Sequence, residues 1–66
     1  MQIKVNGKAL EINRNNNINE LIGKLGIKPD GLAIALNSEV VGKDNFNKIF
    51  LKEGDKVEII HAVQGG

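Results

Sequence analysis

Apolar and polar residues alternate in the first part of the chain, which is the pattern of a strand with one buried face. The apolar positions of this pattern are Ile3, Val5, Leu10 and Ile12. Between its two halves lies Asn6-Gly7, a strong hairpin signal because both residue types tolerate a positive φ. The pattern therefore predicts two antiparallel strands, over residues 2–6 and 9–13.

The apolar period then changes to that of an amphipathic helix. The apolar residues that share one helical face are Ile18, Leu21, Ile22 and Leu25. Asn17 is a suitable N-cap, and Glu20 stands three residues later, as in a capping box. The segment is therefore predicted to be a helix that begins after Asn17.

Glycines mark both the end and the interior of this helix. Gly26 is placed to adopt the left-handed conformation that ends a helix, and Ile27 can then fold back on Ile22. Gly23 lies inside the helix, where glycine costs about 1 kcal/mol relative to alanine. Close packing of the helix on a sheet is one explanation for Gly23.

Alternation returns after the helix. Leu32, Ile34 and Leu36 alternate with Ala33, Ala35 and Asn37, which predicts a third strand. A turn at Ser38-Glu39 leads to a short strand at Val40-Val41. Residues 45–50 hold two phenylalanines and predict a single helical or 3₁₀ turn that fills the core. After a turn at residues 53–55, the last strand is expected from Lys56 to about Val63.

The predicted order of elements is ββαββ, a short turn, then β. A hairpin, one helix across the sheet and a final strand that returns to the middle make the β-grasp, or ubiquitin-like, arrangement. We therefore predict an α+β fold with a mixed sheet of four to five strands and one helix packed across it. The predicted domain covers residues 1–63, and residues 64–66 form a flexible C-terminal tail.

Composition excludes several classes of function. The 66 residues include no cysteine, which removes disulfides and thiolate metal sites, and the acidic residues lack calcium-loop spacing, so no metal site is predicted. The net charge is +1 and aromatic residues make up 3% of the chain, which disfavours nucleic-acid binding. No apolar run is long enough for a membrane helix or a signal peptide. We expect a cytoplasmic protein that is monomeric on its own.

The sequence ends with Gln64-Gly65-Gly66. A Gly-Gly tail has no Cβ atoms, so it is thin, unhindered at its last carbonyl and able to enter a narrow catalytic cleft of another protein. A terminal carboxylate is ionised at neutral pH and is a poor acyl donor, so it reacts only after conversion into an acyl-adenylate. Two interpretations stay open at this point, a frayed end without function and a reactive group.

The last predicted strand also indicates a surface for a partner. If Val57 and Ile59 face the core, the next residues along the strand face outward because side chains alternate. The residues predicted for this partner surface are Ile60, Ala62, Ala33, Ala35 and Glu58. The alternative is that these are scattered exposed apolar residues without a role.

Four segments carry a resemblance to a known family: Val5-Asn6-Gly7, Leu25-Gly26, residues 36–41 and residues 51–66. The most specific is the last, which ends in Ala-Val-Gln-Gly-Gly after a Glu-Gly-Asp turn. These segments resemble the ThiS family of sulfur carriers in thiamine biosynthesis, and the resemblance spans the whole chain. One departure is Gly42-Lys43, where the family often has Pro-Arg, and it concerns partner fit more than chemistry.

The resemblance implies a protein co-substrate that is not itself an enzyme. An E1-like adenylyltransferase (ThiF-type) would adenylate Gly66 with ATP and Mg²⁺, and Gly65 and Gln64 would complete the reactive tail. A persulfide sulfur donor would convert the adenylate into a thiocarboxylate, which would donate its sulfur to thiazole synthase (ThiG-type). No cofactor bound to the chain itself is expected.

Three alternatives stay open. The small subunit of molybdopterin synthase shares the fold and the Gly-Gly end, although Ala62-Val63-Gln64 favours the thiazole route. A ubiquitin-like modifier would be joined to lysines of other proteins. A non-catalytic β-grasp binding module would carry an incidental Gly-Gly.

His61 is the single histidine, and a surface or strand-packing role is predicted for it.

Overall fold

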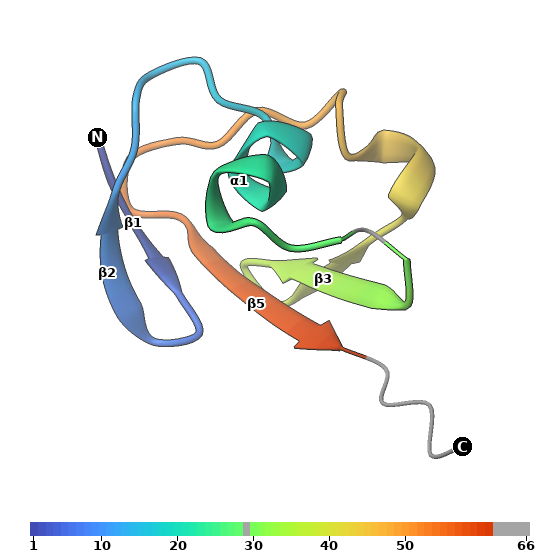
Figure 1. The fold of residues 1–66 in the computed structure, drawn as a ribbon. Helices are drawn as coiled ribbons and strands as arrows, with labels where there is room; N and C mark the ends of the chain where they lie inside the picture. Colours follow the sequence, from blue (N-terminus) through green and yellow to red (C-terminus); the bar gives the residue numbers. More distant parts are fainter. Residues whose placement is uncertain (29, 62–66) are drawn as a thin grey trace.

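The computed structural model describes residues 1–28 and 30–61. The elements follow in the order β1 (Gln2–Val5), β2 (Lys8–Glu11), α1 (Ile18–Leu25), β3 (Leu32–Leu36), β4 (Glu39–Val41), the 3₁₀ helix η1 (Lys43–Asn45) and β5 (Lys56–His61). The strands form one sheet in the order β2-β1-β5-β3-β4, with α1 lying across one face (Figure 1). The last strand therefore lies in the middle, parallel to β1 and antiparallel to β3, and the β-grasp prediction is confirmed.

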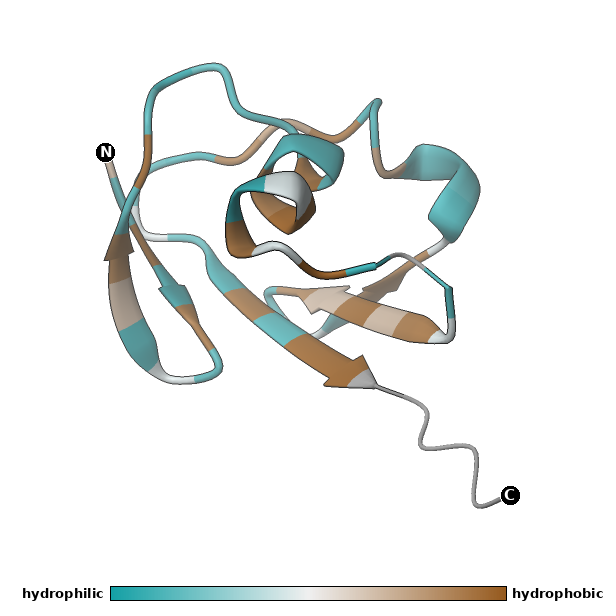
Figure 2. Cartoon of the chain, viewed as in Figure 1, coloured by the Kyte–Doolittle hydropathy of each residue, from teal (hydrophilic) through white to brown (hydrophobic). Residues whose placement is uncertain are grey.

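The core lies between α1 and the inner face of the sheet. The hydrophobic side of α1 is turned toward the sheet (Figure 2). The buried hydrophobic residues are Ile3, Ile12, Ile18, Leu21, Ile22, Ile34, Val41, Phe46, Leu51, Val57 and Ile59. Burial of one such side chain contributes about 1.5–3 kcal/mol. Val57 and Ile59 belong to β5, so the strand that leads to the tail is anchored in the core.

The predicted ends of α1 are confirmed. Asn17 caps the helix, because its Oδ1 accepts a hydrogen bond from the Glu20 N–H at 2.7 Å. Glu20 Oε1 accepts one from the Asn17 N–H at 3.0 Å, which completes the capping box. At the other end Gly26 has φ 70°, and the Ile27 N–H donates to the Ile22 carbonyl at 3.1 Å.

Two predictions about the first half of the chain need correction. A Cβ added at Gly23 would meet no atom within 4 Å, so close packing on the sheet does not explain this glycine. The first two strands end earlier than the predicted 2–6 and 9–13, at Val5 and Glu11. Asn6 and Gly7 have φ 51° and 84°, so the backbone leaves β1 at Asn6 and enters β2 at Lys8.

Two predictions about the second half also need correction. The turn after β3 is at Asn37-Ser38, with φ 50° and 72°, one residue earlier than expected, so Glu39 already belongs to β4. The 3₁₀ helix lies at Lys43–Asn45, ahead of most of the predicted segment 45–50. Phe46 fills the core as expected, but Phe50 is 52% exposed. The expected continuation of β5 beyond His61 lies outside the described residues.

Candidate functional site

Strand β5 carries the root of the predicted tail and is held on both sides. Toward β3 its residues pair in antiparallel register, from Leu36 opposite Val57 to Leu32 opposite His61. Toward β1 the pairing is parallel and begins with Lys4 opposite Lys56. The β5 backbone therefore reaches the root of the tail as a central strand, not as a free edge.

Asn6 extends the support of β5 beyond the end of β1. Its N–H donates to the Val57 carbonyl at 2.9 Å. Its side chain then takes the place of a further strand residue, since Oδ1 accepts from the Ile59 N–H at 2.8 Å and Nδ2 donates to the Ile59 carbonyl at 3.3 Å. The Asn6-Gly7 pair predicted the hairpin turn. The alternation of apolar and polar residues did not predict the two hydrogen bonds between the Asn6 side chain and Ile59, which we call the side-chain clamp.

The side chains of β5 alternate as predicted. Val57 is 1% exposed and Ile59 9% exposed, whereas Glu58 is exposed and Ile60 is 59% exposed. The face opposite α1 therefore receives Glu58 and Ile60. This result fixes the register on which the predicted partner surface depends.

Four of the five residues predicted for the partner surface come together on this outer face. Ile60 lies opposite Ala33, and Glu58 lies opposite Ala35. Val40 of β4 is on the same face, opposite Ala35, and is 82% exposed. We call Ile60, Ala33, Ala35 and Val40 the outer apolar patch. The fifth predicted residue, Ala62, lies outside the described residues.

Val40 was not predicted as part of the partner surface, because the sequence does not show which way its side chain points. The pair Val40-Val41 shows no alternation, so the sequence does not say which valine faces the core. The register decides it, because Val41 pairs with the buried Ile34 and is itself buried. Val40 must then point to the opposite face.

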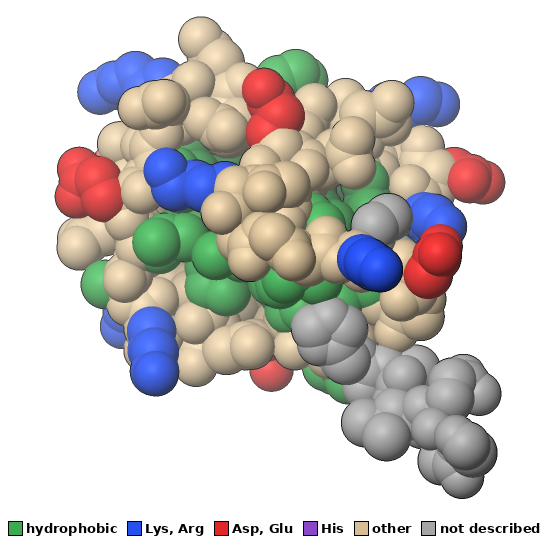
Figure 3. Space-filling view, viewed as in Figure 1, with side chains coloured by type: hydrophobic (Ala, Val, Ile, Leu, Met, Phe, Trp, Pro, Cys, Tyr) green, Lys and Arg blue, Asp and Glu red, His purple; other side chains and the backbone are tan. Residues whose placement is uncertain are grey.

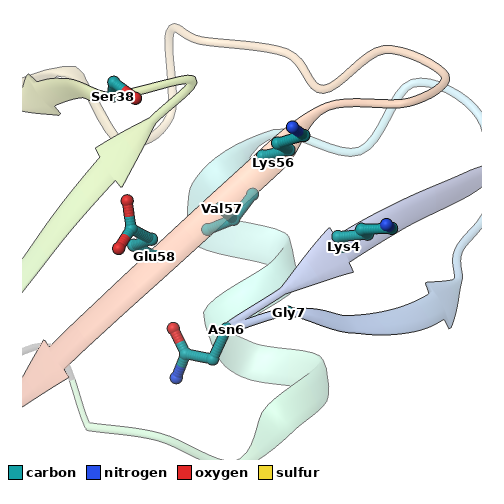
Figure 4. A pocket seen from close by; sticks show the side chains of 7 residues that line it. All are labelled: Lys4, Asn6, Gly7, Ser38, Lys56, Val57 and Glu58. Atoms are coloured by element: carbon teal, nitrogen blue, oxygen red, sulfur yellow. The ribbon is translucent and has the colours of Figure 1, made fainter.

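A shallow hollow adjoins the outer apolar patch. It has a volume of about 490 Å³ and lies over β1 and β5, between the turn after β1 and the turn after β3. Figure 4 shows its lining, with Lys4 and Lys56 on neighbouring strands and Ser38 on the hairpin beyond β5. The residues that line it are Lys4, Asn6, Gly7, Ser38, Lys56, Val57 and Glu58.

Figure 3 shows the surface of the molecule from the same direction as Figure 1. Cationic and anionic side chains are scattered around it, and hydrophobic side chains are visible along its middle (Figure 3). One ion pair links Lys43 Nζ to Asp30 Oδ1 at 3.3 Å, and both side chains are well exposed. Such a pair contributes little to stability.

The carboxylates of the turn before β5 accept hydrogen bonds within the turn and from neighbouring segments. Asp55 Oδ2 accepts from the Lys52 N–H at 2.8 Å, and its Oδ1 accepts from Asn37 Nδ2 at 3.0 Å. Glu53 Oε1 accepts from the Gln2 N–H at 3.1 Å. In the part of the chain that the structure describes, no three Asp or Glu side chains are close enough to hold a metal ion. Within the same residues, no helix is long and apolar enough to cross a membrane.

The predicted reactive tail itself, Gln64-Gly65-Gly66, lies outside the described residues, as does the predicted boundary between domain and tail at residues 63 and 64. The tail follows β5, which is the central strand of the sheet. One face of β5 is anchored in the buried core. The opposite face presents an apolar patch beside the root. This arrangement suits recognition by a larger partner.

Comparison with known proteins agrees with this geometry. A model of the ThiS family matches residues 3–66. The sulfur carrier protein ThiS of Escherichia coli (strain K12) is 26% identical over 66 residues, which are 100% of both chains. A thiazole synthase of Paramagnetospirillum magneticum is 29% identical over all 66 residues of the chain. The chain spans about a fifth of the length of that relative and of a second thiazole synthase, from Magnetococcus marinus.

A solved structure shares the whole fold. The crystal structure of the thiamine biosynthesis protein ThiS from Geobacter metallireducens superposes with a TM-score of 0.88 and 30% identity, covering 100% of both chains. A solution structure of a thiamine biosynthesis protein from the same organism gives a TM-score of 0.81. Both similarities extend over the sheet order and the single helix described above.

Proposed function

The chain belongs to the ThiS family, and from this premise we propose that it is a sulfur carrier of thiamine biosynthesis. In this role it is a protein co-substrate, and other proteins perform the catalysis. The observation that carries the proposal is the family match over residues 3–66, which runs through both glycines of the tail. The central, well-anchored β5 supports it, since a carrier must present its tail from a rigid body.

The reactive group in the proposed cycle is the carboxylate of Gly66. An E1-like adenylyltransferase binds ATP and Mg²⁺, and a carboxylate oxygen attacks the α-phosphorus with release of pyrophosphate. The acyl-adenylate is a good acyl donor because AMP leaves readily, whereas the free carboxylate is not. Gly65 and Gln64 give the tail the reach and thinness to enter the cleft.

Sulfur enters at the adenylate. The outer sulfur of a persulfide attacks the activated carbonyl, AMP leaves, and an acyl disulfide forms. A thiol then cleaves the S–S bond, which leaves a thiocarboxylate on Gly66 and a disulfide on the donor side. The thiocarboxylate is the form that donates sulfur. The chain contains no cysteine, so every thiol in this sequence of steps belongs to a partner.

Thiazole synthase is the proposed acceptor of the sulfur. Two proteins named thiazole synthase each contain a segment similar to the entire chain. A carrier-like segment within the synthase chain places the two activities at a high effective concentration. We propose that this chain serves the same acceptor and that the cycle takes place in the cytoplasm.

The proposed docking surface is the outer face at the root of the tail. It consists of Ile60, Ala33, Ala35 and Glu58 on the described strands, with Val40 added and Ala62 expected to continue it. An apolar surface next to the reactive tail lets a partner grip the domain while the tail enters its active site.

Reconstitution tests the proposal. The chain is incubated with the E1-like enzyme, ATP and Mg²⁺, and ATP–pyrophosphate exchange is measured for the full chain and for a variant lacking Gly65 and Gly66. The full chain should support exchange and the shortened chain should not, while the melting temperature changes little because the tail follows the last core-facing strand residues.

Other outcomes would identify the alternatives. Ladders of conjugates on a denaturing gel would identify a ubiquitin-like modifier. Sulfur delivery to a molybdopterin precursor, without delivery to thiazole synthase, would identify a molybdopterin-type carrier. Full biological activity after removal of Gly66 would show a binding module whose glycines are incidental.

A further inference from the structure

The outer face of the sheet has two halves of different chemistry. Along β5 the outward side chains are Ile60, Glu58 and Lys56, at intervals of two residues. Ile60 belongs to the outer apolar patch, near the tail. Lys56 lies about 13 Å farther from the tail, since a strand rises about 3.3 Å per residue. The face therefore changes from cationic at Lys56 to apolar at Ile60, with Glu58 between them.

The cationic half consists of two lysines side by side. Lys4 of β1 and Lys56 of β5 are paired in the parallel register, so both point outward from neighbouring strands about 4.8 Å apart. Both line the hollow, together with the hydroxyl-bearing Ser38 (Figure 4). Like charges at adjacent positions of a sheet are unfavourable. An anion bound between the two lysines would relieve this repulsion.

Glu58 is the one carboxylate among the residues that line the hollow, but it forms no ion pair with Lys4 or Lys56. Neither lysine has a carboxylate oxygen within 4.0 Å in residues 1–28 and 30–61. Asp55 accepts hydrogen bonds from the Lys52 N–H and from Asn37 Nδ2, and Glu53 accepts one from the Gln2 N–H. Asp30 is paired with Lys43. The two ammonium groups on the outer face thus remain available to a partner.

We propose that Lys4 and Lys56 form a second docking point, which receives a carboxylate side chain of thiazole synthase in the hollow. This inference rests on the proposed function and deepens it. The partner surface then needs an apolar side chain against Ile60 and a carboxylate about 13 Å away. Two unlike points fix the orientation of the domain, and with it the direction in which the tail leaves. Charge complementarity of this kind acts mainly on the association rate and on specificity.

Charge reversal of the pair tests this inference. The variant Lys4→Glu/Lys56→Glu is compared with the control variant Lys28→Glu/Lys48→Glu, whose positions are exposed and lie outside the sheet. Both variants replace two positive charges by two negative ones, so their net charges are equal. Circular dichroism and the melting temperature confirm that each variant is folded. Association with purified thiazole synthase from the same organism is measured by stopped flow.

The expected result is specific to the outer face. At about 20 mM salt the Lys4/Lys56 variant should associate at least tenfold more slowly than the wild type, and the control less than threefold. At about 0.5 M salt the difference should shrink to less than threefold, because screening shortens the range of the attraction. Equal slowing of the two variants, or no measurable binding of the wild type, would overturn the inference.

This outcome is separable from the proposed function. Association requires no ATP and no modified tail, whereas pyrophosphate exchange reports the chemistry at Gly66. If exchange fails while the lysine-dependent association is found, the docking point stands and the carrier chemistry is wrong. If exchange succeeds and the two variants associate equally with the synthase, the docking point is wrong and the carrier chemistry stands.

Discussion

Replacement of Asn6 by glycine removes the side-chain clamp on β5 without disturbing the turn. Asn6 has φ 51°, a conformation that glycine adopts freely, so the backbone path is retained. The substitution deletes two hydrogen bonds to Ile59, one accepted at 2.8 Å and one donated at 3.3 Å. The hydrogen bond from the Asn6 N–H to the Val57 carbonyl remains.

The expected loss in the free energy of unfolding can be worked out from these contacts. A hydrogen bond contributes about 0.5–1.5 kcal/mol net, and the 3.3 Å contact should lie at the lower end. Glycine adds about 0.5–1 kcal/mol through the greater freedom of the unfolded chain. The free energy of unfolding should therefore fall by about 2–3 kcal/mol. In a domain of this size 1 kcal/mol corresponds to about 4–8 °C, so the melting temperature should fall by about 10–20 °C.

Asn15→Gly is the matched control. Asn15 also has a positive φ, 66°, but its side chain makes no hydrogen bond to other residues in the described part of the chain. Its replacement should change the free energy of unfolding by less than about 1 kcal/mol. The assay is urea denaturation of both variants, with hydrogen exchange of the Ile59 amide as a local readout. Exchange at Ile59 should accelerate in the Asn6 variant and not in the control.

Two results would contradict a stabilising role for the Asn6 side chain. If Asn6→Gly and Asn15→Gly lose equal stability, the hydrogen bonds to Ile59 contribute nothing measurable. If Asn6→Gly is strongly destabilised but Ile59 exchanges as in the wild type, the loss arises elsewhere than at the root of the tail.

Three further predictions concern the helix, the outer face and the tail. Gly23→Ala should stabilise the domain by about 0.5–1 kcal/mol, because the added methyl group enters open space on a helix, and a lower urea midpoint would contradict this. Ile60→Asp should cost the monomer no more than about 0.5 kcal/mol, as Ile60 is 59% exposed, while its affinity for the E1-like enzyme falls at least tenfold. Equal loss of folding and binding would show that Ile60 is structural. Gly66→Ala should lower pyrophosphate exchange at least tenfold with binding largely retained, since a misplacement of about 1 Å can cost on the order of a hundredfold in rate. Equal exchange rates would mean that Gly66 is not recognised by shape.

Local signals predicted the fold well where one residue type determines the backbone. The capping box of Asn17 and Glu20 and the helix end at Gly26 depend on contacts within a few residues, and all are found. The alternation of β5 likewise gave the exposure of Ile60. These features require no knowledge of the rest of the chain.

Predictions that depend on tertiary context were less successful. The role of Gly23 could not be read from its position in the helix, because open space around it is a property of the assembled fold. Phe50 is an aromatic residue that the sequence places in the core, yet it lies exposed beside Asn17, with which it forms an isolated β-bridge. Phe46 and Leu51 are the buried residues of that part of the chain, and Ile49 is partly buried against them.

In the candidate site, too, local sequence patterns predicted some features, and tertiary contacts determined the others. The partner surface was predicted from alternation, except for Val40, whose orientation follows only from its pairing with Ala35. The juxtaposition of Lys4 and Lys56 joins residues from the two ends of the chain, and only the parallel register of β1 and β5 reveals it. The clamp between Asn6 and Ile59 likewise spans most of the sequence.

The intact mass of the protein purified from its native cells shows whether Gly66 carries transferable sulfur. Replacement of OH by SH at the carboxyl group adds about 16 Da. The account predicts such a species, with fragmentation confining the added mass to Gly66, and its loss after incubation with thiazole synthase. A chain found only with a plain carboxylate under conditions of active thiamine synthesis, or a chain that continues beyond Gly66, would contradict it.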